Sequence, residues 1–127
     1  MKTGYIIISV IIAVLMLFFT FNKIYRYKII DKRLRKKIIS GATILDVRTD
    51  SEYKKCHIEG SVNISLGTIR ERYIELDLTK TYVTYCSHGL RSIKVKNILK
   101  DKGFKKVFNG GTMSDLETII EKYSLKE

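Results

Sequence analysis

The amino-terminal part of the chain is an unbroken apolar run. Residues 3–22 contain no charged side chain and consist mostly of Ile, Val, Leu, Met and Phe. At a rise of 1.5 Å per residue, about 20 helical residues span about 30 Å, the thickness of the hydrocarbon core of a bilayer. The run therefore predicts a transmembrane helix.

A cleaved secretory signal is the alternative for this run. Such a signal has a charged leading segment, a shorter apolar stretch and small residues at the cleavage site. Here only Lys2 precedes the run, and residues 18–22 offer no pair of small residues. The pattern favours an uncleaved membrane anchor over residues 1–23.

After residue 24, short β-like runs alternate with amphipathic segments. Residues 43–47 and 81–85 are rich in β-branched, aliphatic or aromatic residues, which is typical of buried strands. Apolar residues at helical spacing predict helices in the segments that follow them. Such alternation predicts an α/β fold, an open parallel sheet with helices on both faces. The remaining predicted elements are strands at 27–30 and 106–108, a turn at 109–111, and helices at 31–39 (capped by Asp31 and ended by Ser40–Gly41), 67–76, 90–102 and 113–123.

The formal net charge of +11 is concentrated beside the apolar run. Residues 23–37 hold eight of the 24 Lys and Arg residues and only one acid. An excess of basic residues marks the cytoplasmic side of a membrane helix and is attracted to anionic lipid. We therefore predict a single-pass membrane protein without a nucleic-acid partner. Its expected parts are a bilayer anchor at 1–23, a basic juxtamembrane segment at 24–37 and a cytoplasmic domain at 38–127.

Cys86 is the candidate for chemistry because it lies between a predicted strand and a predicted helix. The first amides of a helix have no intrahelical partner, and the helix dipole is positive there, so a thiolate is stabilised. Gly89 allows the loop to turn, and Arg91 adds a positive charge. We expect a lowered pKa of the Cys86 thiol and a nucleophilic sulfur. The alternative is an ordinary buried cysteine at a strand end.

The stretch Cys86-Ser87-His88-Gly89-Leu90-Arg91-Ser92 resembles the C-x-x-G-x-R-S active-site loop of rhodanese-domain sulfurtransferases. The resemblance implies that Cys86 takes up a sulfane sulfur as a persulfide. It also implies a substrate-binding loop whose backbone amides surround that sulfur, formed by Ser87, His88, Gly89, Leu90 and Arg91. The six-residue loop matches the sulfur-handling members, whereas phosphatases and arsenate reductases of this fold are disfavoured because their loop is longer.

A second stretch, Asp46-Val47-Arg48-Thr49 followed by Glu52-Tyr53 and residues 57–64, resembles the other rhodanese signature. Within it we interpret Asp46 and Arg48 as an ion pair that supports the catalytic loop together with Ser92. Cys56 replaces the glycine that is usual in the family and is either an exposed cysteine or a resolving thiol. His57 is either a hydrogen-bonded structural residue or a general base. The departures from the family pattern are Cys56, Ser61 and Ser65, and Thr112 and Met113 where aromatic residues often follow the two glycines.

Together these features predict a rhodanese-like sheet preceded by one transmembrane helix. The resemblance implies transfer of sulfur from thiosulfate or a protein persulfide to an acceptor protein or small nucleophile, through a Cys86 persulfide. A membrane-tethered binding or sulfur-carrier module without turnover is the alternative. We infer no cofactor, and no metal because no His and Cys lie at zinc-ligand spacing. Both cysteines are expected to be thiols in a reducing cytoplasm.

Overall fold

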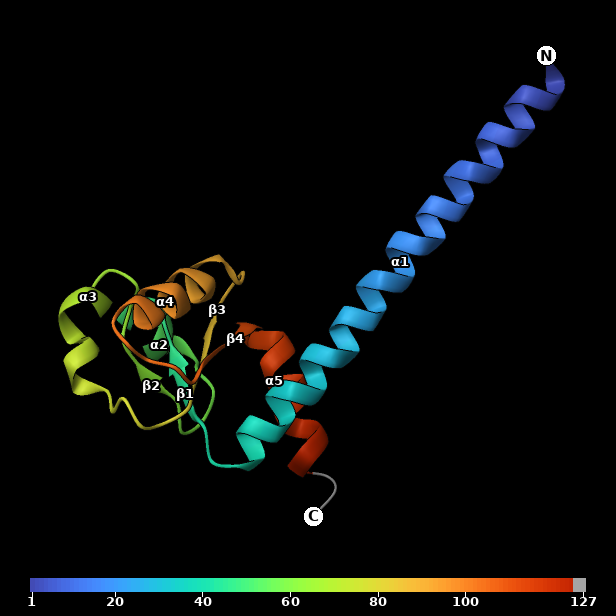
Figure 1. Cartoon of the computed structure of the whole chain (residues 1–127). Helices are drawn as coiled ribbons and strands as arrows, with labels where there is room; N and C mark the ends of the chain where they lie inside the picture. The colour runs from blue at the N-terminus through green and yellow to red at the C-terminus, as the bar shows by residue number, and fades with distance from the viewer. Residues whose placement is uncertain (125–127) are drawn as a thin grey trace. The chain divides into compact units, whose positions relative to one another are not determined.

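Strands and helices alternate along the carboxyl-terminal three quarters of the chain (Figure 1). The computed structural model describes residues 1–124, without the side chains of residues 27–31 and 123. It divides into two compact units, Met1–Arg33 and Leu34–Glu127. The elements are α1 (Lys2–Ile39), β1 (Thr43–Asp46), α2 (Asp50–Lys55), β2 (Val62–Asn63), α3 (Ile69–Arg72), the 3-10 helix η1 (Tyr73–Glu75), β3 (Tyr82–Cys86), α4 (Leu90–Asp101), β4 (Val107–Thr112) and α5 (Met113–Ser124).

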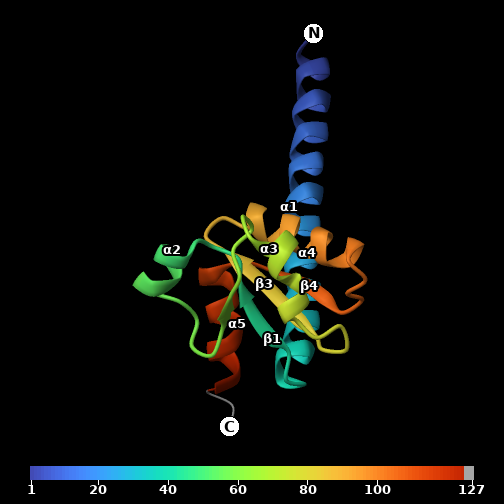
Figure 2. The same cartoon turned by 90° about the vertical axis from the view of Figure 1, so that its left-hand side faces the viewer.

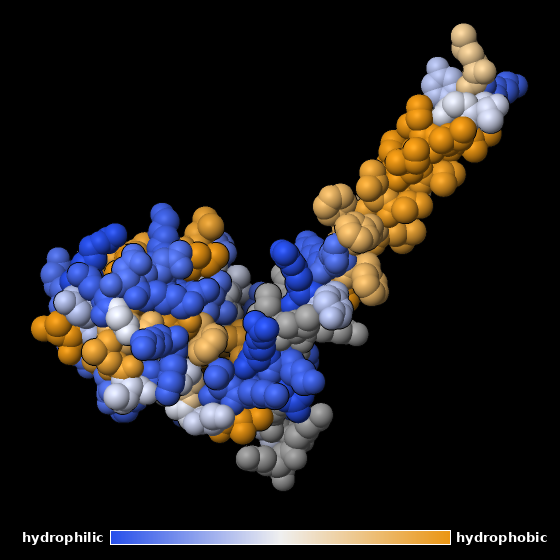
Figure 3. All heavy atoms as spheres, viewed as in Figure 1, coloured by the Kyte–Doolittle hydropathy of each residue, from blue (hydrophilic) through white to orange (hydrophobic). Residues whose placement is uncertain are grey.

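The first unit consists of most of α1, and its apolar part is a long stretch of helix. Residues Lys2–Arg26 form 25 residues of helix, and their most apolar 18-residue window has a mean hydropathy of 2.6 and is entirely exposed. Figure 3 shows hydrophobic side chains on this stretch of the helix. By length and composition this helix is able to cross a membrane, and an N-terminal signal sequence meets the same criteria.

The strand predicted at residues 27–30 and the helix cap predicted at Asp31 are wrong, since α1 runs through both. Extending an existing helix costs far less than nucleating a new element, and residues 21–39 contain neither glycine nor proline. A β-prone run of four residues is therefore absorbed into the helix. The end of the helix follows the prediction: α1 stops at Ile39, and Gly41 has a φ of +91°.

The second unit is built on a four-stranded, wholly parallel sheet with strand order β2-β1-β3-β4. The central strand β3 is buried along its whole length, because helices cover both faces of the sheet. Helices α3 and α4 lie on one face and α5 on the other (Figure 1, Figure 2). The predicted open parallel sheet with helices on both faces is confirmed. The core residues of the α4 side include Leu45, Ile69, Val95 and Leu99, and those of the α5 side include Leu34, Val83, Tyr85 and Leu116.

Other elements also differ from the sequence prediction, which included neither α2 nor β2. The helix expected at 67–76 is split into α3 and η1. The turn expected at 109–111 lies inside β4, which is longer than predicted and has an irregular register opposite the end of β3. A glycine fits here because a Cβ at Gly110 would lie 2.8 Å from the carbonyl oxygen of Thr84. Gly110 thus allows β4 to pass close beside β3, while Gly111 adopts a φ of +78° that favours glycine.

Candidate active site

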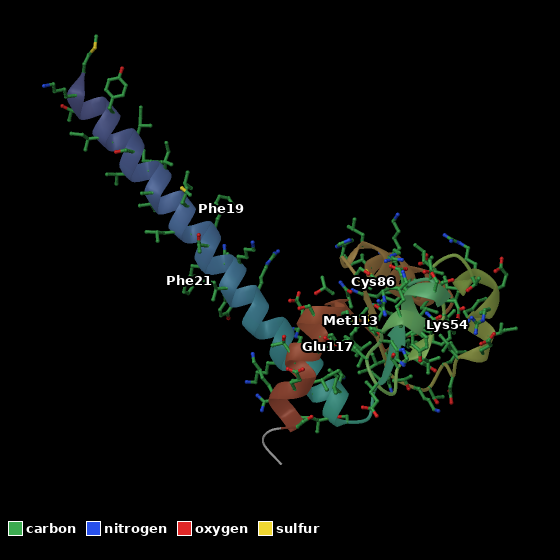
Figure 4. All side chains as sticks on the ribbon, turned by 180° about the vertical axis from the view of Figure 1, so that it is seen from behind. Phe19, Phe21, Lys54, Cys86, Met113 and Glu117 are labelled. Atoms are coloured by element: carbon green, nitrogen blue, oxygen red, sulfur yellow. The ribbon has the colours of Figure 1, made fainter. Side chains whose placement is uncertain are left out.

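Cys86 is the last residue of β3, at the carboxyl edge of the sheet (Figure 4). Three residues later Gly89, with a φ of +90°, is the N-cap of α4. A side chain is disfavoured at that φ, so glycine permits the sharp connection between strand and helix. Sites in open parallel sheets occur at the carboxyl ends of strands. The strand, the loop and the helix therefore place one thiol where the first amides of α4 are unpaired.

Backbone amides converge on this thiol. The amide of Gly89 donates a hydrogen bond to Cys86 Sγ over 2.9 Å. Burial raises the pKa of the Cys86 thiol, but hydrogen bonds from the amides of Ser92, Gly89 and His88 and from the Ser92 hydroxyl lower it further than burial raises it. As a result, the pKa of the Cys86 thiol lies below its ordinary value. The predicted supporting residue Ser92 thus also lowers the pKa of the thiol.

The sulfur is enclosed as well as activated. Cys86 is 1% exposed and belongs to the buried cluster on the α4 side of the sheet, together with Val95 and Leu99. The residues that follow it are more accessible: Ser87 is half-buried, and His88 and Leu90 are exposed. The reactive atom therefore lies at the base of a loop whose outer side chains face solvent.

Arg91 shares its charge with a carboxylate that the sequence analysis missed. Its guanidinium forms two parallel hydrogen bonds with Glu52, of 2.8 Å and 3.0 Å, and the two side chains are 31% and 34% exposed. Hydrogen bonding to Arg91, and to the backbone and hydroxyl of Thr49, holds the pKa of the Glu52 carboxyl well below its usual range. The pKa of Arg91 is raised by Glu52 first and also by Cys86, so the guanidinium favours the thiolate as expected. Its positive charge, however, is offset by Glu52.

Glu52 also fixes the element from which it comes. It is the N3 residue of α2, and its carboxylate accepts hydrogen bonds from the amide and hydroxyl of Thr49, the N-cap, over 2.9 Å and 2.8 Å. This capping box ties the start of α2 to the same carboxylate that holds Arg91. The only sequence signal for this role was the position of Glu52 in the second family signature.

The predicted ion pair between Asp46 and Arg48 is present and buried. Arg48 Nη2 lies 2.6 Å from Asp46 Oδ2, and Arg48 also donates to the carbonyl oxygen of Cys56 over 2.7 Å. Tyr85, missed by sequence analysis, donates its hydroxyl proton to Asp46 over 2.7 Å. A buried Tyr hydroxyl needs a hydrogen-bond partner, so a tyrosine in a predicted buried strand was the sequence signal for this contact. Because Tyr85 precedes Cys86, this network fixes the end of the catalytic strand.

A second set of polar contacts joins the loop to β4. The hydroxyl of Ser92 lies 2.8 Å from the carbonyl oxygen of Gly89 and 2.7 Å from Asn109 Oδ1. That Asn109 oxygen also accepts from the amide of Gly111 over 2.9 Å. Ser92 is fully buried. Asn109, which we had placed in a turn, instead anchors the first turn of α4 to the neighbouring strand.

The remaining candidate residues lie outside this cluster of contacts. Cys56 is exposed, as one of its two interpretations expected. His57 is exposed, its Nδ1 lies 2.7 Å from the carbonyl oxygen of Tyr53, and its ring stacks on that of Tyr53 with centroids 3.8 Å apart. These contacts favour the structural interpretation of His57. Over the residues that the structure describes, no group of three or more His, Cys, Asp or Glu side chains is arranged to hold a metal ion.

Fold and site together define a parallel α/β protein with an activated cysteine at the carboxyl edge of its sheet. Residues 30–113 match the family model of the rhodanese-like domain, and the chain belongs to that family. The "rhodanese with anions from E. coli" has a similar fold: it is 32% identical with a TM-score of 0.56, over 59% of this chain and 91% of that structure.

Curated relatives support sulfur transfer as the general chemistry. The tRNA sulfurtransferase of Thermoplasma acidophilum is 38% identical over 87 residues, which cover 68% of this chain and 17% of that protein. The thiosulfate sulfurtransferase PspE of Escherichia coli is 34% identical over 74 residues, 57% of this chain and 71% of that protein. A Bacillus subtilis relative matches over only 36% of its length. The chain thus spans less than two fifths of the Thermoplasma acidophilum and Bacillus subtilis relatives.

Proposed function

We propose that the protein transfers a sulfane sulfur through a persulfide on Cys86. The observation that carries this proposal is the lowered pKa of an enclosed thiol whose sulfur accepts the Gly89 amide at 2.9 Å. A thiolate is the nucleophile in sulfur exchange, and a terminal persulfide sulfur is likewise anionic. The same unpaired amides therefore suit both states of the cysteine.

The transfer has two substitution steps. The Cys86 thiolate attacks the outer sulfur of the donor; an Sγ–S bond forms while the donor S–S bond breaks, and the leaving group departs with the electron pair. With thiosulfate the leaving group is sulfite. With a protein persulfide it is a thiolate. An acceptor nucleophile then attacks the terminal sulfur of the persulfide, and Cys86 leaves as the thiolate, so no external oxidant or reductant is needed.

The loop residues bind the substrate, and the contacts around the loop hold it in a fixed conformation. In this proposal Cys86 is the catalytic residue, and Asp46, Arg48 and Ser92 support the loop. A solved NAD-dependent persulfide reductase from A. fulgidus, 37% identical with a TM-score of 0.50 over 58% of this chain and 14% of that chain, supports a persulfide as a substrate. The E. coli thiosulfate sulfurtransferase supports thiosulfate. The loop residues that bind the transferred sulfur and its carrier are Ser87, His88, Gly89, Leu90 and Arg91.

Mass spectrometry tests the persulfide directly. Incubation with thiosulfate or a cysteine persulfide should add one sulfur atom, about 32 Da, to Cys86. Cys86→Ser should not gain it, whereas the matched control Cys56→Ser should, since it removes the exposed thiol and keeps Cys86. Absence of the adduct with both donors would refute the proposal.

A sulfur-carrier module without turnover is the second candidate. The 1% exposure of Cys86 favours it, because a protected persulfide persists longer than an open one. Steady-state transfer from thiosulfate to cyanide separates the two functions. A carrier should load Cys86 once and release no further product, whereas an enzyme should turn over repeatedly.

We further propose that residues 1–23 anchor the domain to the cytoplasmic face of a membrane. The length and hydropathy of α1 and the basic residues after the apolar run support this placement. The exposed Cys56 is a natural reporter. A membrane-impermeant thiol reagent should label Cys56 only after cells are lysed, and labelling of intact cells would reverse the orientation.

A further inference from the structure

The face of the domain beside the catalytic loop carries a groove between α3 and α4. Its volume is about 350 Å³, and it is lined by Leu66, Arg70, Lys94, Asn97 and Ile98. Helices α3 and α4 lie side by side there (Figure 2). The lining contains two cations and one amide but no carboxylate.

A stripe of exposed residues on α4 links this groove to the catalytic loop. Leu90, Ile93, Lys94 and Asn97 recur at i, i+3, i+4 and i+7, which places them on one helix face. All four are exposed, and the two apolar residues, nearest the loop, are 70% and 42% exposed for Leu90 and Ile93. The stripe is therefore apolar next to Cys86 and cationic farther along the helix.

We propose that this stripe and groove dock an acidic segment of a partner protein that presents its cysteine to Cys86. The proposal rests on the proposed sulfur transfer and names the class of donor or acceptor. Arg70 and Lys94 form no ion pair with the described residues. Both cations are therefore available to form ion pairs with carboxylates of a partner. The apolar residues at the loop end select a protein segment, because neither a small anion nor a phosphate backbone covers Leu90 and Ile93.

The position of the stripe matches the geometry of the reaction. Leu90 is four residues after the reactive cysteine and opens α4, whose first turn supplies the Ser92 amide to the sulfur. A segment that packs on Leu90 and Ile93 brings its own sulfur to the loop. The partner persulfide is then attacked at its outer sulfur by the Cys86 thiolate, and the partner thiolate leaves; the reverse step loads an acceptor.

Synthetic peptides of one length, each carrying a single cysteine persulfide, test this surface. One peptide has Asp and Leu flanking the cysteine, and the other has Lys in place of Asp. The full chain in detergent, with Cys56→Ser, is mixed with each peptide, and the second-order rate of sulfur uptake by Cys86 is followed by mass spectrometry. The acidic peptide should react about tenfold faster than the lysine peptide.

Charge reversal in the groove should invert this preference. Lys94→Glu should slow the acidic peptide about tenfold and accelerate the lysine peptide. Lys100→Glu, an equal charge change at an exposed position of α4 outside the groove, should stay within about twofold of the parent for both peptides. Alkylation of Cys86 by neutral iodoacetamide should be unchanged in both variants, which shows that the thiol is intact.

Three results would overturn the docking surface. Equal rates for the two peptides, or equal effects of Lys94→Glu and Lys100→Glu, would remove the charge argument. Stronger inhibition by a single-stranded RNA oligonucleotide than by an unpersulfidated acidic peptide would assign the groove to nucleic acid. Loading from thiosulfate without any preference between peptides refutes docking alone, whereas no loading from any donor refutes the proposed function as well.

Discussion

Glu52→Gln separates the charge of Arg91 from the carboxylate that offsets it. The substitution keeps the shape of the side chain, and its amide oxygen is still able to accept from Arg91, but the negative charge is lost. In the folded chain that charge lies 2.8 Å and 3.0 Å from the two guanidinium nitrogens. Arg91 also interacts with Cys86, so its charge should then act on reagents that approach the thiol.

The expected size follows from Coulomb's law. Both side chains are about one third exposed, so a water-like dielectric applies rather than that of an interior. A unit charge about 4–8 Å from a singly charged reagent then changes its free energy by about 0.5–1 kcal/mol, a factor of about 2–5 in rate. Because the hydrogen bonds that the carboxylate accepts from Arg91 and Thr49 lose their charged acceptor, the free energy of unfolding should also fall by about 1 kcal/mol.

Competition between two alkylating reagents measures this charge without interference from the thiol pKa. Iodoacetate is an anion and iodoacetamide is neutral, and both react with the thiolate, so the ratio of their rates cancels any change in thiolate fraction. In a Cys56→Ser background, Glu52→Gln should raise the iodoacetate to iodoacetamide ratio about 2–5-fold. The matched control is Glu75→Gln, which breaks an ion pair of similar length, 2.9 Å to Arg72, without contact to the loop.

The reasoning fails on either of two results. An unchanged ratio in Glu52→Gln, with the far-ultraviolet circular dichroism spectrum preserved, would mean that Glu52 does not offset the charge of Arg91. An equal rise in Glu75→Gln would mean that the net charge of the domain, rather than this ion pair, controls the approach of anions.

Three further predictions concern stability. Arg48→Met leaves the buried carboxylate of Asp46 without its counter-ion and should lower the free energy of unfolding in urea by about 3–5 kcal/mol; a loss below about 1 kcal/mol would contradict a buried charge. Gly110→Ala would place a Cβ 2.8 Å from a β3 carbonyl oxygen and should lower the free energy of unfolding by about 2 kcal/mol or more. The control Gly67→Ala, whose Cβ has its nearest contact at 3.8 Å, should lower it by less than about 1 kcal/mol. Equal losses in the two variants would refute the clash. The pKa of Glu52 in the folded chain is below its ordinary value of 4.5. Its contribution to stability is therefore present above about pH 4.5 and is lost as the pH falls through the folded pKa. Between pH 6 and pH 3 the melting temperature should fall less in Glu52→Gln than in the parent.

The two central strands of the sheet, β1 and β3, were predictable from their composition. Residues 43–47 and 81–85 read as strands from their apolar or β-branched character alone, and the helical segments between strands supply the crossovers that parallel pairing requires. The strand predicted at residues 27–30 was wrong, and the composition of these four residues alone does not show why. It continues a helix already formed, and extending that helix costs less than starting a new element.

The contacts that hold the site together were less predictable because they join distant parts of the chain. Glu52 and Arg91 are 39 positions apart, as are Asp46 and Tyr85. Neither pair has a periodic signature, and the second becomes visible only when β1 and β3 are known to be adjacent. The ion pair of Asp46 with Arg48 was predictable since the two residues are two positions apart, at the end of one strand.

The causes of the lowered pKa of Cys86 explain why the spacing of the loop residues, more than their side chains, indicated the active site. Burial alone would raise the pKa of this thiol, and a single cation, already shared with Glu52, is not the main cause that opposes it. The principal donors are backbone amides, which every residue except proline possesses, so their effect depends on where the chain turns rather than on which side chains it carries. Gly89 supplies the turn at φ +90° and its own amide to the sulfur. Substitutions at exposed loop positions should therefore alter which partners approach, whereas only those that move Gly89 or Ser92 should alter the reactivity of the thiol itself.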